Sequence, residues 1–208
     1  MKAGGLRWIM SERAWLGVFE AQPNGRILCR HELTWRGITP ERAAEAIKSL
    51  KLSYVVAQAD IFPKLQERGE TVSETFQRCG VPMRKGSADR LALWSRLRSW
   101  LAVRKWADGT EGPGLLLHAD CKFLIRTLPT LVESDTEPDD VAETPDEYPA
   151  MGVALYVMAR PTPWLAPQTT NDPDPLSGAY LWNELRSGGD LKAEKRVGHN
   201  RHRERNWV

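Results

Sequence analysis

Two apolar runs on either side of Pro23-Asn24-Gly25 constrain the fold more than any other feature of the sequence. The runs cover residues 16–20 and 26–33. Asn-Gly between two such runs is a strong signal for a β-hairpin, because both residues tolerate the backbone conformations of a tight turn. The short apolar segment 6–10 predicts one more strand before the hairpin. The chain is therefore expected to begin with three strands.

Helix and strand signals alternate after the hairpin. Thr39-Pro40 is an N-cap followed by proline at the first helical position, and the β-branched run 53–57 suits a buried strand. Thr71 and Glu74 have the spacing of a capping box. The later segments are an edge strand at 81–83, a helix capped by Ser87 that runs to residue 101, a strand at 114–118, a helix at 121–128, an acidic loop at 133–145 and a buried helix at 149–159. This order predicts an α/β fold in which helices flank a mixed β-sheet.

The composition is that of a globular chain and excludes several classes of protein. Hydrophobic residues make up 41% and charged residues 27%, but no apolar run is long enough for a transmembrane helix, and the N-terminus does not resemble a signal peptide. The three cysteines form no CxxC pair and the four histidines no HExxH motif, which argues against structural zinc and for a reducing compartment. Prolines after residue 161 predict one domain over 1–161 and a Pro-rich, then basic tail over 162–208.

Charge is distributed unevenly although the net charge is only +2. The segment 84–105 has seven basic residues and a single acid, Asp89, whereas 133–147 has eight acids and no base. Arg90 is expected to be exposed to water on the helix of this basic segment. The residues expected to form a phosphate-binding face are Arg84, Lys85, Arg96, Arg98 and Arg104. The alternative interpretation is a set of solvated helix faces with an acidic loop.

Three stretches, taken in order, resemble the C-terminal nuclease domain of large terminase subunits from tailed phages. They are GGLRW with WLGVFEAQPNGRILCRHELTWRGITPERAAEAI, YVVAQADIF with GETVSETFQRCGVPM, and GLLLHADCKFLIRTLPTL with DEYPAMGVALYVMARP. The resemblance spans roughly residues 4–161 and implies a ribonuclease H-like fold. It also implies a DNA endonuclease that uses two divalent metals about 4 Å apart, held by carboxylates from separate elements. Because the chain begins at the family's first nuclease strand, we expect no ATPase domain.

The three positions that match the family's metal-binding carboxylates carry other residues here. Their flanking residues place Arg7, Gln58 and Met151 at these positions, and a slip of one residue would replace Met151 by Gly152. None of these side chains can replace a carboxylate pair, so no metal cofactor is expected. Arg7 would put a fixed positive charge where two divalent cations belong. It either stands in for a cation, pairing with remaining acids or a DNA phosphate, or turns away from the site.

Three nearby acids are candidates for relocated ligands. Asp60 lies two residues after Gln58, and Glu147 lies one helical turn before Met151. Asp120 follows the last predicted strand and could instead cap the next helix. For Asp60 and Glu147 the alternative is ordinary exposure to solvent.

Three functions remain open from the sequence. The first is a catalytically silent, terminase-nuclease-like domain in a bacterial host cell's cytoplasm. Such a domain would bind double-stranded DNA weakly and without sequence specificity, or bind phage packaging proteins through its basic tail. The second is an active Mg²⁺- or Mn²⁺-dependent endonuclease with relocated carboxylates. The third is a structural adaptor that makes no contact with nucleic acid or membrane.

Overall fold

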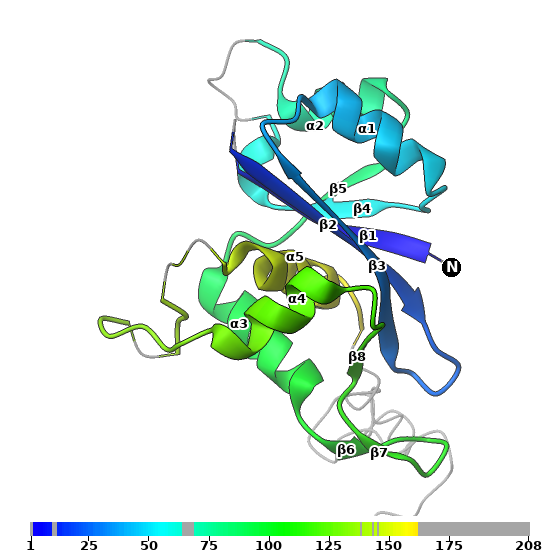
Figure 1. Ribbon diagram of the computed structural model, residues 1–208, viewed down its shortest axis with the longest axis vertical. Coiled ribbons are helices and arrows are strands. Elements are labelled where there is room, and N and C mark those ends of the chain that lie inside the picture. Colours follow the sequence, from blue (N-terminus) through cyan, green and yellow to red (C-terminus); the bar gives the residue numbers. More distant parts are fainter. Residues whose placement is uncertain are drawn as a thin grey trace, which may run out of the picture. The chain divides into compact units, whose positions relative to one another are not determined.

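A six-stranded mixed sheet forms the centre of the computed structural model, which describes residues 2–9, 12–63, 69–137, 139–142, 144 and 146–161 (Figure 1). The strands lie in the order β5-β4-β1-β2-β3-β8. Their bounds are β1 (Lys2–Ile9), β2 (Arg13–Ala21), β3 (Ile27–Arg36), β4 (Val55–Ala57), β5 (Met83–Lys85) and β8 (Leu115–Leu117). The first three are antiparallel, and β4, β5 and β8 join them in parallel. The tail predicted at 162–208 lies outside the described residues.

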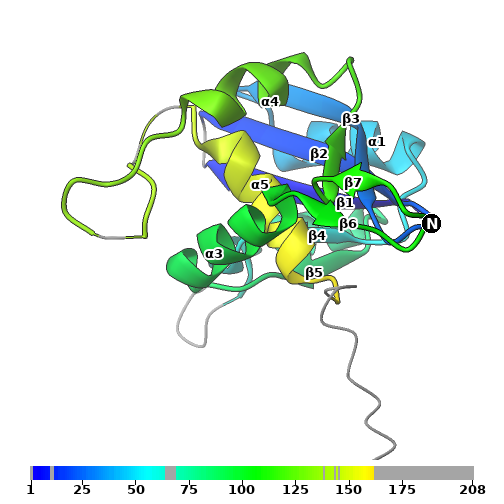
Figure 2. The same cartoon turned by 90° about the horizontal axis from the view of Figure 1, so that it is seen from below.

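Helices cover both faces of this sheet (Figures 1 and 2). Their bounds are α1 (Pro40–Ser49), α2 (Val72–Arg78), α3 (Arg90–Leu101), α4 (Lys122–Thr127) and α5 (Tyr148–Met158), with 3-10 turns η1 (Ala59–Ile61) and η2 (Leu128–Thr130). On one face α1 and α2 pack over the core formed by Leu6, Leu16 and Val55. On the other face α5 packs on β1 and β2, and α3 packs on α5. The predicted mixed sheet with flanking helices is therefore confirmed.

The hairpin between β2 and β3 forms where the sequence predicts it. The Gly25 N–H donates to the Gln22 carbonyl at 3.0 Å, and the Gln22 N–H donates to the Arg26 carbonyl at 2.8 Å. Gly25 has φ +90°, a conformation that glycine adopts without a steric penalty. Pro23 occupies the second position of this turn, where its fixed φ is favourable. Pro23-Asn24-Gly25 therefore closes the hairpin.

The structure corrects one local prediction and adds one element that was not predicted. Helix α3 is capped by Asp89, whose carboxylate accepts from the Ala92 N–H at 3.0 Å. Ser87, the predicted cap, instead accepts from the Asp89 N–H at 3.1 Å and so shapes the approach to the helix. The added element is a short hairpin formed by β6 (Arg104–Lys105) and β7 (Glu111–Gly112). Within the described residues, no helix is long and apolar enough to cross a membrane.

Helix α5 approaches β1 closely through two glycines. A Cβ atom on Gly5 would lie 2.3 Å from the Gly152 carbonyl oxygen, and one on Gly152 would lie 2.6 Å from the Trp15 ring. Neither separation is possible for real atoms, so the helix can lie this close only because both side chains are absent. Residues 148–157 of α5 are all buried, which explains why this helix is apolar all round. The contact fixes α5 across β1, beside the candidate site.

Candidate functional site

A cavity of about 250 Å³ lies where β1 and β4 end, between η1, the start of α3 and helix α5. Its polar or charged lining residues are Arg7, Gln58, Asp60, Ser87 and Arg90, and its apolar wall includes Leu93, Met151 and Leu155. The three positions matched to the family's carboxylates therefore meet at one cavity, together with one of the three candidate acids.

The parallel register of β1 and β4 explains this meeting. Leu6 pairs with Ala57, so Arg7 and Gln58 are the next residues on neighbouring strands. Met151 lies beside Gly152, the point at which α5 contacts β1. The two strands are adjacent, and α5, which carries Met151, packs on both of them.

Gln58 is bound to the backbone of β1. Its Oε1 accepts from the Trp8 N–H at 3.0 Å, and its Nε2 donates to the Trp8 carbonyl. The side chain is 5% exposed, so water does not compete for these hydrogen bonds. An amide has the donor and the acceptor that this backbone pair requires, whereas an ionised carboxylate has acceptors alone. Gln58 therefore continues the pairing of β4 with β1 through its side chain.

Arg7 is half-buried, and no counter-ion for it is found among the residues that the structure describes. Its Nε is buried without a hydrogen-bond partner, and its side chain forms no ion pair or hydrogen bond with any other described residue. Asp60 lines the same cavity but is exposed and makes no ion pair with Arg7 within the described part of the chain. A desolvated guanidinium without such a partner is unfavourable, because burial disfavours an uncompensated charge. Arg7 thus contributes positive charge to the cavity that the surrounding side chains do not neutralise.

Arg90 binds two carboxylates at the edge of the cavity. Its Nε donates to the two oxygens of Asp140 at 2.8 and 2.9 Å, and its terminal nitrogens donate to Glu147 at 2.8 and 3.2 Å. The hydrogen bond to Glu147 raises the pKa of Arg90 above its usual range, against the opposite effect of burial. Partial burial raises the pKa of Asp140, but hydrogen bonds from Arg90 and the Val141 N–H outweigh this effect and lower it. The expectation that Arg90 is exposed to water is therefore wrong, and Glu147 is held in an ion pair.

Asp120 lies away from this cavity. It follows β8, which is three strands from β1, and its carboxylate is 3.1 Å from Nδ1 of His118. It does not cap α4, as one interpretation of the sequence suggested. That role belongs to Glu32, whose carboxylate accepts from the N–H groups of Phe123 at 2.5 Å and of Leu124 at 3.1 Å. The sequence carries no local signal for Glu32, because its partners lie about ninety residues further along the chain.

The donor set at the cavity does not fit a pair of hard divalent cations. Mg²⁺ and Mn²⁺ prefer carboxylate and other oxygen ligands. Asp60 is a carboxylate, but Arg7 is a cation, Met151 has a thioether, and both polar groups of the Gln58 amide bind Trp8. Across the part of the chain that the structure describes, no three His, Cys, Asp or Glu residues are grouped so as to hold a metal. The side chains at this cavity therefore do not support two-metal hydrolysis.

The predicted phosphate-binding residues are in three different situations. Arg96 donates to the carbonyls of Val157 and Arg160 at 3.3 and 2.5 Å, and burial lowers its pKa. Arg98 binds Asp139, and Arg104 donates to the Ser99 carbonyl. Arg84 and Lys85 are exposed on the edge strand β5, where Arg84 lies over the Tyr54 ring at 4.0 Å.

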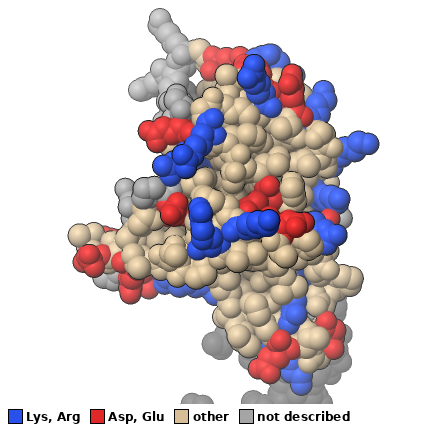
Figure 3. All heavy atoms as spheres, in the orientation of Figure 1, with Lys and Arg blue, Asp and Glu red and all other residues tan. Residues whose placement is uncertain are grey.

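Charges of both signs alternate on the face of the molecule drawn in Figure 3, without a broad field of either sign. The structure also has ion pairs between exposed side chains, such as Arg98 with Asp139 and Lys2 with Glu20. Mixed charges of this kind favour solubility over strong attraction of a polyanion. On this face, contact with nucleic acid would therefore depend on a few particular residues.

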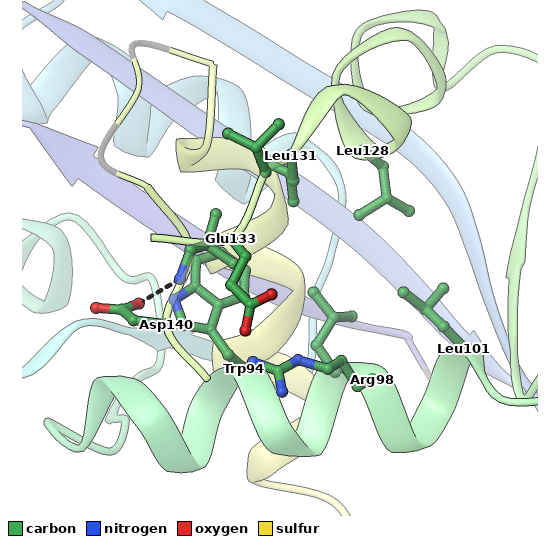
Figure 4. A pocket seen from close by; sticks show the side chains of 10 residues that line it. Trp94, Arg98, Leu101, Leu128, Leu131, Glu133 and Asp140 are labelled. Carbon is green, nitrogen blue, oxygen red and sulfur yellow. Dashed lines mark hydrogen bonds between the residues drawn. The ribbon is translucent and has the colours of Figure 1, made fainter. Parts of the chain in front are cut away.

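A second, larger cavity of about 340 Å³ was not predicted. It lies between α3, η2 and the acidic segment (Figure 4). Trp94, Leu101, Leu128 and Leu131 supply apolar walls, whereas Arg98, Glu133 and Asp140 lie at its polar side. Asp140 is already hydrogen-bonded to Arg90, and the cavity brings together no nucleophile with a base. It offers an apolar surface and no evident catalytic chemistry.

The mixed sheet and its helical layers form a ribonuclease H-like fold. Among solved structures, the chain is similar to the large terminase of a thermophilic bacteriophage, bound to an ATP analogue, with a TM-score of 0.58 and 11% sequence identity over 75% of this chain. It is also similar to the P22 large terminase nuclease domain, with a TM-score of 0.55 and 13% identity over 77% of this chain and 82% of that domain. The chain spans 39% of the length of the thermophilic phage's terminase. No sequence family and no curated protein sequence matches it.

Proposed function

We propose that this chain is a terminase-nuclease-like domain that serves phage DNA packaging by binding DNA or a packaging protein, without cutting DNA. The likeness to the terminases of the thermophilic phage and of P22 supports the association with packaging. Because sequence identity to both is below 15%, this likeness concerns the fold, and the activity has to be judged from the side chains.

The bonding of Gln58 is the observation that carries the proposal. A nuclease of this fold needs a carboxylate here that faces the metals, whereas this chain has an amide whose donor and acceptor both bind Trp8. The neighbouring cation, Arg7, would repel a divalent ion at the same cavity. Glu147, which could have served as a relocated ligand, is held by Arg90 at 2.8 Å. These contacts favour a domain that has the nuclease fold but does not have the metal ligands at the matched positions.

Three assays test the proposed function. Purified protein is incubated with supercoiled plasmid in Mg²⁺ and separately in Mn²⁺, and we expect no nicked or linear product. Nicking that is abolished by Asp60→Ala or Glu147→Ala would overturn the proposal in favour of an endonuclease with relocated ligands.

Binding to duplex DNA is then measured at several salt concentrations, where affinity should fall as salt rises because counterions are released from the phosphates. If no DNA binds at low salt, the proposal is reduced to binding of packaging proteins. A pull-down with purified phage packaging proteins then tests that remaining part, and retention of none of them would overturn it.

A further inference from the structure

The positive charge of Arg7 requires a negative partner that the described side chains do not provide. Its buried Nε has no hydrogen-bond partner. The nearby carboxylates of Glu147 and Asp140 are both bound by Arg90, at 2.8 Å. Asp60 lines the cavity without pairing with Arg7 in the described structure. An anion that enters from outside would both neutralise the guanidinium and accept its unused hydrogen bonds.

The cavity restricts the size of that anion. Its volume of about 250 Å³ is below the range of about 300–1,000 Å³ that is usual for drug-sized ligands. Leu93, Met151 and Leu155 form an apolar wall on one side, so the polar group has to face Arg7. A single phosphate group fits within this volume and can place its oxygens against Arg7.

We propose that this cavity binds one phosphate group directly on the Arg7 guanidinium, without a metal ion. In a two-metal nuclease the divalent cations hold the phosphate oxygens of the substrate. Here a fixed cation occupies the equivalent place, and a planar guanidinium with several N–H donors matches phosphate geometry well. The inference rests on the proposed function in one respect, that the phosphate belongs to a nucleic-acid backbone. Free inorganic phosphate has the same chemistry and serves as the independent probe.

Thermal unfolding tests the anion site directly. Wild-type protein is unfolded in EDTA with increasing inorganic phosphate, alongside Arg7→Gln and the matched control Arg42→Gln. Arg42 is exposed on α1, which covers the opposite face of the sheet, and its replacement removes the same charge. We expect phosphate to raise the melting temperature of the wild type and of Arg42→Gln more than that of Arg7→Gln, which retains only the general stabilisation by this salt. Equal phosphate stabilisation of Arg7→Gln and the wild type would overturn the proposal.

The melting temperature without phosphate distinguishes a binding residue from a structural one. Because Arg7 has no protein partner among the described residues, Arg7→Gln should be as stable as the wild type or more stable in the absence of phosphate. A large loss of stability in phosphate-free buffer would assign Arg7 a structural role and contradict the proposal.

Binding to duplex DNA in EDTA separates the two sources of phosphate. Arg7→Gln should weaken DNA affinity by about tenfold, the loss typical of one charge-assisted contact. If phosphate binding depends on Arg7 but DNA does not bind the wild type, the anion site stands and the DNA-binding form of the proposed function fails. If DNA binds the wild type and Arg7→Gln equally and phosphate stabilises both to the same extent, the anion site fails while DNA binding stands.

Discussion

The amide of Gln58 hydrogen-bonds both the N–H and the carbonyl of Trp8, fifty residues away on the neighbouring strand. Strand β4 is three residues long, so this side chain adds one further rung to a short pairing. By the resemblance to terminase nuclease domains, Gln58 stands at a position where that family has a carboxylate that binds metal. The residue that the resemblance matches to a ligand position is therefore, in this chain, part of the framework of the sheet.

Replacing Gln58 should cost stability in proportion to the hydrogen bonds that are lost. Gln58→Glu keeps the size but places an acceptor against the Trp8 carbonyl, and we expect a loss of about 1–3 kcal/mol in the free energy of unfolding. Gln77→Glu, at an exposed position on α2, is the matched control and should change stability by less than about 0.5 kcal/mol. Urea denaturation gives both values. Equal stability of the two variants would contradict the structural role of Gln58.

Restoring one carboxylate should not restore DNA cleavage. Arg7→Asp alone leaves an amide and a thioether at the other two positions, too little negative charge to hold two divalent ions. The triple variant Arg7→Asp, Gln58→Asp, Met151→Asp tests whether the cavity still places three ligands correctly. We expect plasmid to remain supercoiled with the single variant in Mn²⁺. Nicking by the single variant would show that the remaining donors suffice.

The ion pair between Arg90 and Asp140 makes a specific prediction for stability in acid. The folded-state pKa of Asp140 is lowered, so its contribution is complete above the pKa of an unfolded aspartate, about 3.9, and is lost as pH falls through the lower folded value. Asp140→Asn should therefore reduce the melting temperature at neutral pH and flatten its fall below about pH 4. Asp139→Asn, which removes a more exposed carboxylate, is the control for the loss of one negative charge. Parallel curves for Asp140→Asn and the wild type would contradict this account.

The basic residues of segment 84–105 should separate into two groups by experiment. Arg96 binds the last carbonyls of α5 and the following turn, so Arg96→Gln should lower stability by about 1 kcal/mol. Arg84 and Lys85 lie exposed on β5, and the double variant Arg84→Gln, Lys85→Gln should instead weaken DNA binding and reduce its dependence on salt. Chemical denaturation and salt-dependent binding distinguish the two effects. A double variant that binds DNA with the wild-type salt dependence would exclude β5 as a contact surface.

The sequence predicted the elements that depend on neighbouring residues. Pro23-Asn24-Gly25 closes a hairpin, and Thr71 with Glu74 forms a capping box, because the groups involved are close along the chain. The positions of Arg7, Gln58 and Met151 in one site were also predicted, but only through the resemblance to a family. The parallel register of β1 and β4, which brings Arg7 and Gln58 together, is not specified by these short segments themselves.

The partners of several polar side chains could not be predicted. Arg90 was expected to face water, yet its carboxylates lie about fifty residues later, in a segment that reads as an acidic loop. Glu32 caps α4 from a different strand. Gln58 was interpreted as a lost ligand, while its actual partner is backbone. In each case the decisive distance is set by tertiary packing, which local propensity does not encode.

The contact between Gly5 and Gly152 affects which substitutions such a domain can tolerate during evolution. Here the spacing between helix and sheet is set by main-chain atoms in contact, so it is largely independent of which side chains line the cavity beside it. Substitutions at Arg7 or Gln58 can alter charge and bonding without moving α5. Shape and chemistry are therefore separable in this protein, and new ligands could be accommodated by changing single lining residues within a frame that stays the same.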